Sequence, residues 1–232
     1  MAIQYLPPVP IEGHQPSASG GPDHPMRIAT RRAAGIDAGG WTRELRKEVG
    51  DFFDTMSSEW HTRTSPQRTA VVIDALERGF GRQPSRVDVA VEVGSGIGAY
   101  SGLLAQRFAT VLAIDLSLAM LRLAPPDIAH RIQADGAMLP LRDSCAAAVV
   151  LINCFLFPAE VNRILSPDGA LVWVNSSGEQ TPIFLDAEDL LSALPGKWTG
   201  TSSRAGEGTW CVLRRGALNP KSQIPSSKPQ RG

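Results

Sequence analysis

The chain has 232 residues, 43% of them hydrophobic, so it can bury one sizeable core, and we expect one domain with flanking tails. Its formal net charge is zero and its isoelectric point is about 6.9, which provides no overall field for nonspecific binding of nucleic acid or of an anionic membrane. No apolar stretch approaches the roughly 20 residues that span a bilayer, and no signal peptide is apparent. We therefore expect a cytoplasmic protein without nucleic-acid or membrane partners.

The cysteines give no sign of a metal site or of a disulfide framework. Cys145, Cys154 and Cys211 are an odd number and lack C-x-x-C spacing. Cys145 and Cys154 flank an apolar run, which favours small buried hydrophobic side chains. No bound metal is predicted.

The first 40 residues are rich in proline, glycine and serine and lack hydrophobic periodicity, so residues 1–40 are predicted to be mostly disordered. His14 and His24 fall in this segment and are interpreted as solvated side chains rather than metal ligands. Residues 26–40 are basic, and the sequence leaves open whether they dock on the body of the protein.

Residues 41–85 are predicted to form a helical extension that acts as a lid. Apolar residues recur at three- and four-residue steps over residues 41–60, and Thr42 offers an N-cap. A second helix is expected over residues 65–80, because proline at position 66 suits the first helical turn.

A strand, a glycine-rich turn and a helix are predicted around residues 87–108. Residues 87–93 form a short apolar run, and residues 94, 96 and 98 are glycines. Glycine lets the backbone approach a ligand closely, and the following helix presents unpaired N–H groups, so this pattern is typical of a nucleotide-binding turn. A plain glycine-rich turn is the alternative.

Asp115 ends the next apolar strand, residues 110–115, and lies 21 residues after Gly94. A carboxylate at the tip of this second strand can accept hydrogen bonds from both hydroxyls of a ribose and would repel a 2′-phosphate. The alternative is that Asp115 caps a helix over residues 117–123. Gly94, Gly96 and Ala99 also satisfy the NAD fingerprint G-x-G-x-x-A, so the turn alone leaves the ligand open.

Three further strands and a hairpin are predicted downstream. Strands over residues 128–134, 146–152 and 170–174 alternate with helices over residues 159–165 and 187–194, and a hairpin joins residues 197–203 to 208–214. Ligands of open α/β sheets bind outside the carboxyl ends of the strands. That edge brings together four polar side chains that are distant in sequence, namely Glu92, Asp115, Asp135 and Asn153.

The order of these features resembles the class I S-adenosylmethionine-dependent methyltransferases. Glu92 stands two residues before the first glycine, the third strand ends at Asp135-Gly136 with Pro140 shortly after, and no second domain follows that could hold a hydride donor or acceptor. The resemblance covers residues 52–214 and is densest over residues 91–140. It implies that residues 86–215 are the S-adenosylmethionine-binding domain. Residues 216–232 are basic and rich in Pro and Ser, which predicts a disordered tail, with a binding arm as the alternative.

The resemblance also implies the fold and the cofactor. The fold is an α/β Rossmann-like sheet of seven strands in the order 3-2-1-4-5-7-6, mostly parallel with the last strand antiparallel, with helices on both faces and an N-terminal helical extension. The cofactor is S-adenosyl-L-methionine. The residues expected to bind it are Glu92, Gly94, Ser95, Gly96, Gly98, Asp115, Leu116, Met120, Asp135, Gly136 and Asn153.

The expected activity is methyl transfer to a small-molecule acceptor by in-line displacement. The alternatives are a non-catalytic cofactor-binding protein and an NAD-dependent oxidoreductase. No catalytic residue is identified: His61 and Asn153 are the candidates, and the connector 154–158 lacks the acidic or histidine side chains that the family often carries there.

The acceptor is expected to contact residues of the lid and of the carboxyl edge. Trp60 is predicted to lie at the cofactor cleft, where it would exclude water, and the alternative is that it anchors the helix pair elsewhere. The candidate substrate residues are Trp60, His61, Arg63, Phe155 and Ser176.

Overall fold

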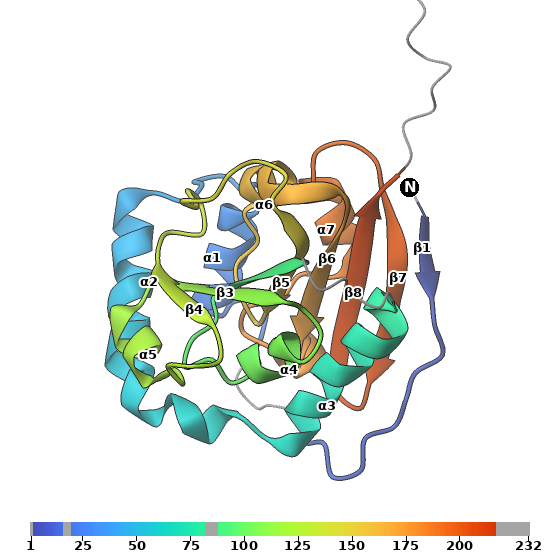
Figure 1. Ribbon diagram of the computed structural model, residues 1–232, viewed down its shortest axis with the longest axis horizontal. Helices are drawn as coiled ribbons and strands as arrows, with labels where there is room; N and C mark the ends of the chain where they lie inside the picture. The colour runs from blue at the N-terminus through green and yellow to red at the C-terminus, as the bar shows by residue number, and fades with distance from the viewer. Residues whose placement is uncertain (1, 16–19, 82–87, 217–232) are drawn as a thin grey trace, which may run out of the picture.

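The computed structural model describes residues 2–15, 20–81 and 88–216. Within them, eight strands form one sheet in the order β1-β7-β8-β6-β5-β2-β3-β4 (Figure 1). The strands are β1 (Ala2–Tyr5), β2 (Val89–Val93), β3 (Thr110–Asp115), β4 (His130–Gln133), β5 (Ala146–Ile152), β6 (Leu165–Asn175), β7 (Trp198–Ala205) and β8 (Gly208–Arg215).

The predicted sheet order is confirmed for seven strands. β4, β3, β2, β5 and β6 are parallel neighbours, and β8 pairs antiparallel with both β6 and β7. The eighth strand, β1, was not predicted; it pairs parallel with β7 and places Ala2 opposite Thr199. This pairing lengthens the sheet at its antiparallel end, away from the glycine-rich turn that follows β2.

Helices cover both faces of the sheet. On one face, the helical residues Val72, Leu76 and Leu104 pack against strand residues in a buried apolar cluster. On the other face, Ile164 and Leu190 pack on a second cluster. The helical elements are α1 (Pro25–Ala33), α2 (Arg43–Met56), η1 (Ser57–Arg63), α3 (Pro66–Asp74), η2 (Ala75–Phe80), α4 (Ser101–Ala105), α5 (Leu118–Leu123), α6 (Pro158–Ile164), η3 (Gly178–Gln180) and α7 (Ala187–Ala193).

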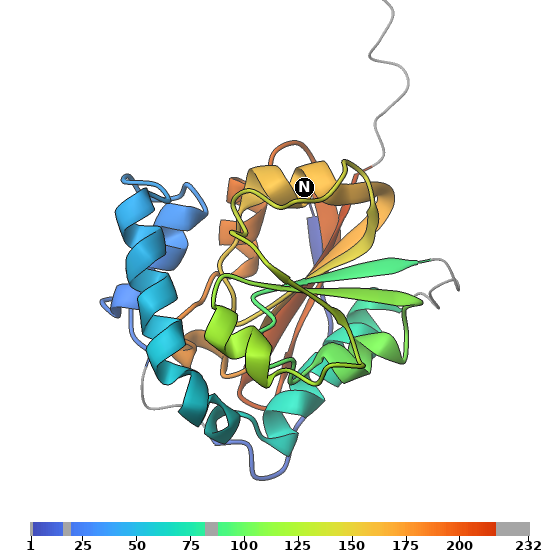
Figure 2. The same ribbon diagram turned by 60° about the vertical axis from the view of Figure 1, so that its left-hand side comes forward.

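The predicted N-cap of the helical extension, Thr42, is present, and Ser65 caps its second helix. The Thr42 hydroxyl accepts a hydrogen bond from the Leu45 N–H, and the Ser65 hydroxyl accepts one from the Arg68 N–H, each at 3.2 Å. α2 runs along one side of the molecule with α1 beside it (Figure 2). Their buried residues Ala29 and Val49 form a third apolar cluster with Phe155, Phe157 and Ile183, so both helices pack at the carboxyl edge of the sheet.

Within residues 1–40, where we expected mostly disorder, the structure has β1 and α1. The Arg27 guanidinium donates to the carbonyl oxygens of Glu179 (2.6 Å) and Thr181 (2.9 Å), and Arg31 forms an ion pair with Asp189 at 3.2 Å. These partners lie more than 150 residues away in sequence, so local periodicity cannot reveal them. The docking that the sequence left open for residues 26–40 therefore occurs.

Neither histidine of this segment is simply solvated. His24 caps α1 by accepting a hydrogen bond from the Met26 N–H, and His14 Nδ1 accepts one from the Glu207 N–H. In the described part of the chain, no group of three or more His, Cys, Asp or Glu residues is arranged to hold a metal ion. No helix among the described residues has the length and apolar character to cross a membrane. The predicted basic tail lies almost entirely outside the described residues.

Candidate functional site

The glycine-rich turn leaves β2 in a conformation that favours glycine. Gly94, Gly96 and Gly98 have φ angles of 70°, 55° and 70°, in the left-handed region. The N–H groups of Gly94 and Ser95 both donate to the Ile114 carbonyl, at 2.8 and 3.0 Å, which ties the turn to β3. The turn therefore presents its backbone at a fixed position on the carboxyl edge of the sheet.

Asp115 holds this turn and the start of α5 together. Its Oδ2 accepts a hydrogen bond from the Gly96 N–H at 2.7 Å, and its Oδ1 accepts one from the Ser117 N–H at 2.8 Å. The side chain that caps α5 is Ser117, which accepts from the Met120 N–H, so Asp115 is not the N-cap. Burial raises the pKa of Asp115, and the backbone N–H donors oppose that shift.

Glu92 lies beneath the turn, buried on β2. The Ser101 hydroxyl donates a hydrogen bond to its Oε2 at 2.5 Å. Burial raises the pKa of Glu92 to about 7, against an ordinary value near 4.5. The carboxyl group is therefore neutral in slightly acidic solution and charged in slightly alkaline solution.

We expect the buried Glu92 to make the protein less stable as the pH rises. The pKa of Glu92 is higher in the folded protein than in the unfolded chain, so the folded state binds more protons between about pH 4.5 and 7. The free energy of unfolding therefore falls by roughly 3 kcal/mol as the pH rises across that window. Glu92→Gln should remove this decline. Urea unfolding at pH 5 and pH 8 measures it, with exposed Glu48→Gln as the control; an equal decline in Glu92→Gln would contradict the assignment.

Most of the predicted site residues line one cleft at the carboxyl edge. Its empty volume, including the part open to solvent, is about 970 Å³. The lining residues come from the turn, from the ends of β3, β4 and β5, and from the N-terminal helices. Those predicted from the sequence are Trp60, Glu92, Gly94, Ser95, Gly96, Asp115, Leu116, Met120, Asp135, Gly136, Asn153 and Phe155.

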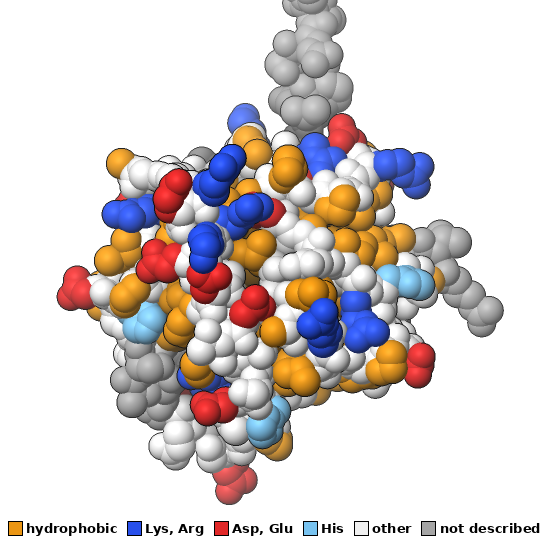
Figure 3. Space-filling model, turned by 90° about the vertical axis from the view of Figure 1, so that its left-hand side faces the viewer, with side chains coloured by type: hydrophobic (Ala, Val, Ile, Leu, Met, Phe, Trp, Pro, Cys, Tyr) orange, Lys and Arg blue, Asp and Glu red, His pale blue; other side chains and the backbone are white. Residues whose placement is uncertain are grey.

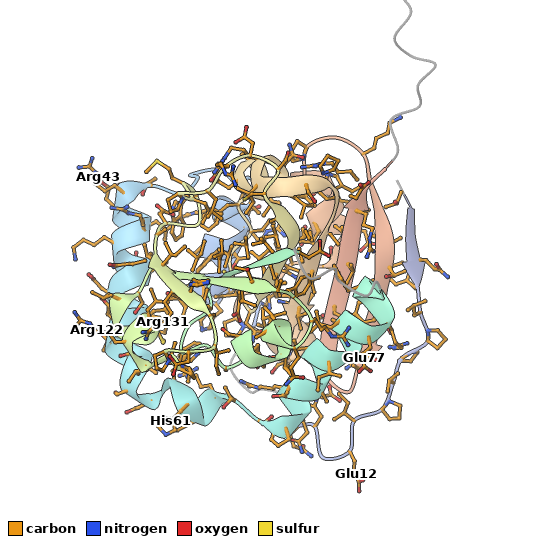
Figure 4. All side chains as sticks on the ribbon, in the orientation of Figure 1. Glu12, Arg43, His61, Glu77, Arg122 and Arg131 are labelled. Carbon is orange, nitrogen blue, oxygen red and sulfur yellow. The ribbon has the colours of Figure 1, made fainter. Side chains whose placement is uncertain are left out.

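Four predicted residues do not line the cleft. A Cβ on Gly98 would meet Ala124 at 3.2 Å, so this glycine permits close packing against the end of α5 rather than ligand approach. Ser176, His61 and Arg63 are also outside the lining residues. His61 is exposed and points away from the body (Figure 4), with its Nδ1 3.1 Å from the Ser58 carbonyl oxygen, so it is badly placed to act as a base.

Trp60 lies in the wall of the cleft, directly against the glycine-rich turn. A Cβ added to Gly96 would be 3.5 Å from Trp60 Nε1. Phe53 of α2 meets the Trp60 ring edge to face at 5.4 Å, and the Arg63 guanidinium lies 5.2 Å from the same ring. The alternative position for Trp60, away from the cleft, is excluded by these contacts.

Asn153 is engaged with the neighbouring strand end. Its φ is 49°, and its side-chain amide donates to the Ser176 hydroxyl at 2.9 Å and accepts from the Ser176 N–H at 2.8 Å. The pair joins the connectors that follow β5 and β6. Both polar atoms of the Asn153 side chain therefore have structural partners, which does not favour a catalytic role.

Trp41 is a cleft residue that the sequence did not reveal. Its Nε1 donates to the Asp135 carboxylate at 3.1 Å, and its ring packs on Phe155 and Phe157 with centroids 5.3 and 5.1 Å apart. Asp135 also accepts from the Ala137 N–H. Trp41 is in step with the helical periodicity, four residues before Leu45, but its partner Asp135 is 94 residues away. The periodicity predicts a buried side chain and cannot show that this one reaches the cleft.

Comparison with known proteins agrees with this geometry. Residues 91–173, which run from β2 to β6, match the methyltransferase-domain family. The malonyl-[acyl-carrier protein] O-methyltransferase of Marinomonas sp. (strain MWYL1) is 29% identical over 162 residues, covering 63% of this chain and 57% of that protein. A protein of Micromonospora griseorubida, assigned by its name to methylation of guanine N(1) in 23S rRNA, is 30% identical over 124 residues, covering 51% and 42%. The chain thus spans about half the length of these two relatives.

A solved structure shares the fold. The DhpI–SAH complex superposes with a TM-score of 0.62 at 18% identity and covers 77% of this chain and 100% of that one. At this identity the likeness concerns the fold alone. Residues 91–173 therefore match a methyltransferase domain, and the sheet that contains them has the fold of a solved structure with bound SAH.

Proposed function

We propose that the cleft transfers the methyl group of S-adenosylmethionine to a small-molecule acceptor by in-line displacement. The proposal rests on one observation, namely that a single cleft joins the glycine-rich turn to an apolar region. It runs from the turn at Gly96 and the carboxylate of Asp115 to an apolar region walled by Phe53, Trp60 and Phe155. A cofactor on the turn and an acceptor in the apolar region would therefore share one enclosed space.

The residues at the turn fit the cofactor. Ser95 is buried, and its hydroxyl lacks a hydrogen-bond partner among the described residues although it lines the cleft. Asp115 uses one lone pair of each oxygen for backbone N–H groups and keeps a further lone pair on each for ribose hydroxyls. Carboxylates at Glu92, Asp115 and Asp135 suit a positively charged ligand.

Each part of the cofactor then has candidate partners. Glu92, Gly94, Ser95 and Gly96 would hold the methionine portion. Asp115 would hold the ribose. The adenine would lie at the ends of β3 and β4, against Leu116, Met120, Asp135 and Gly136.

When bound, S-adenosylmethionine supplies a methyl group on a cationic sulfonium, which is already a good leaving group. The contribution required of the protein is then mainly orientation and exclusion of water, and positioning alone can supply up to about 7–11 kcal/mol. Trp60 and Phe53 cover the turn, and Trp41 closes the side at Asp135. These side chains are placed to align the acceptor and keep water out.

One face of the protein has mixed charge, which supports a small acceptor rather than a nucleic acid. Lys and Arg side chains alternate with Asp and Glu side chains on the face shown in Figure 3, where no large area of a single sign appears. The formal net charge is zero. Phosphate contacts normally require a basic area, so this distribution favours a small molecule.

Methyl transfer from tritiated S-adenosylmethionine to the small-molecule fraction of a cell extract tests the proposal. We expect label in an extractable product with the wild-type protein and none with Gly96→Val. A wild-type protein that binds the cofactor but transfers no label would favour a non-catalytic cofactor-binding role.

A further inference from the structure

The acceptor region of the cleft is aromatic. Phe53 and Trp60 come from the lid with ring centroids 5.4 Å apart, and Phe155 comes from the connector after β5 and packs on Trp41 at 5.3 Å. Aromatic faces bind planar apolar molecules, and they also attract positive charge. Such walls favour a flat ligand.

The charges of the cleft have one sign. Among the described residues that line it, the acidic groups are Glu92, Asp115 and Asp135, and none is Lys, Arg or His. Described cations near the cleft lie outside its lining: Arg46 is 3.7 Å from Asp135, and Arg63 lies over the Trp60 ring. A carboxylate or phosphate on an acceptor would therefore enter the cleft unpaired and be repelled, at a considerable cost in affinity.

Among the described lining residues, the carboxylates are those that the proposed function assigns to the cofactor: Glu92 to the methionine portion, Asp115 to the ribose and Asp135 to the adenine. With the cofactor bound, none of the three is left to remove a proton from the acceptor. The remaining ionisable lining groups are a phenol and a thiol, at Tyr100 and Cys154. Burial raises the pKa of both, so they stay protonated. The attacking atom must therefore arrive with a free lone pair.

We propose that the acceptor is a neutral aromatic molecule that is methylated on an unprotonated ring nitrogen, held between Phe53, Trp60 and Phe155. This inference rests on the proposed function and narrows its acceptor to one chemical class.

The transfer balances without a base. The nitrogen lone pair forms the new bond to the methyl carbon as the carbon–sulfur bond breaks, and the electron pair of that bond stays on sulfur. The positive charge passes to the ring nitrogen, and S-adenosylhomocysteine leaves as a neutral thioether group. Total charge in the cleft is unchanged, and the aromatic faces and carboxylates that faced the sulfonium also stabilise the cationic product.

A matched probe pair tests the charge requirement. Quinoline and quinoline-6-carboxylate differ by one anionic group, and calorimetry with protein saturated in S-adenosylhomocysteine measures their binding without turnover. We expect quinoline to bind at least about tenfold more tightly, and mass spectrometry to find N-methylquinolinium when S-adenosylmethionine replaces S-adenosylhomocysteine. Equal or tighter binding of the carboxylate overturns the inference, and so does failure of both probes to bind or of quinoline to be methylated.

Two neighbouring phenylalanines provide the matched variants. Phe53→Leu should weaken quinoline binding about three- to tenfold by removing an aromatic wall, and should weaken the binding of S-adenosylhomocysteine less. Phe52→Leu is the control, because Phe52 is 40% exposed and is not a lining residue. Equal effects of the two substitutions would contradict the assignment of the wall.

The binding of S-adenosylhomocysteine distinguishes a failure of the proposed function from a failure of the acceptor class alone. If the wild-type protein does not bind it, the proposed function fails. If it binds and the carboxylate probe is preferred, the proposed function stands and the acceptor class alone is wrong.

Discussion

Gly96→Val is expected to abolish binding of S-adenosylmethionine while leaving a folded protein. Gly96 faces the cleft, and an added Cβ would lie 3.5 Å from Trp60 Nε1, which is an ordinary contact. The Cβ therefore fits the unliganded protein, and the two methyl groups beyond it would occupy the space that the cofactor needs. Calorimetry should detect no heat of binding.

The control for this substitution must carry the same backbone strain. Gly81→Val does so, because Gly81 has φ of 63° against 55° for Gly96, and a Cβ there meets nothing closer than 3.9 Å. Both variants should lose similar unfolding free energy, and Gly81→Val should bind the cofactor normally. Retained binding in folded Gly96→Val would refute the placement of the cofactor on this turn.

Asp115→Ala is expected to lower both cofactor affinity and stability. Two charge-assisted hydrogen bonds to the ribose would be lost, each contributing about 1.5–3 kcal/mol, so the affinity should fall at least about tenfold. The Gly96 and Ser117 N–H groups would also lose their acceptor, which costs about 1–3 kcal/mol of unfolding free energy. Because burial raises the pKa of Asp115, part of that cost is offset.

Calorimetry and urea unfolding together check this variant, with exposed Asp127→Ala as the control. A parallel titration with NAD shows which cofactor the cleft binds. We expect heat of binding with S-adenosylmethionine and none with NAD. Unchanged affinity in Asp115→Ala would mean that Asp115 serves the turn alone and that the ribose lies elsewhere.

Features that depend on nearby residues could be predicted from the sequence. The glycine-rich turn, the carboxylate at the end of β3, the cap at Thr42 and the proline in the first turn of α3 are local patterns with a direct physical cause, and each is present. The order of seven strands followed from resemblance to a known family and not from periodicity. Periodicity alone does not specify which strands are neighbours.

Features that depend on distant residues could not be predicted. β1 forms only because residues 2–5 meet residues 199–202, and Trp41 reaches the cleft through Asp135. His61 was favoured by its residue type, but it points away from the body while Trp60, beside it in η1, lines the cleft, and tertiary packing decides which side of η1 faces the cleft. Asn153 was expected to face a ligand, and its partner proved to be Ser176, on the neighbouring connector.

A crystal structure of the protein with S-adenosylhomocysteine tests most directly whether this cleft is the methyl-transfer site. We predict that the ribose hydroxyls contact Asp115, that the homocysteine portion lies along the backbone of Gly94–Gly96, and that the sulfur faces the space between Phe53, Trp60 and Phe155. Density for the ligand outside this cleft, or a sulfur that faces away from the three aromatic side chains, would contradict both the site and the acceptor region assigned here.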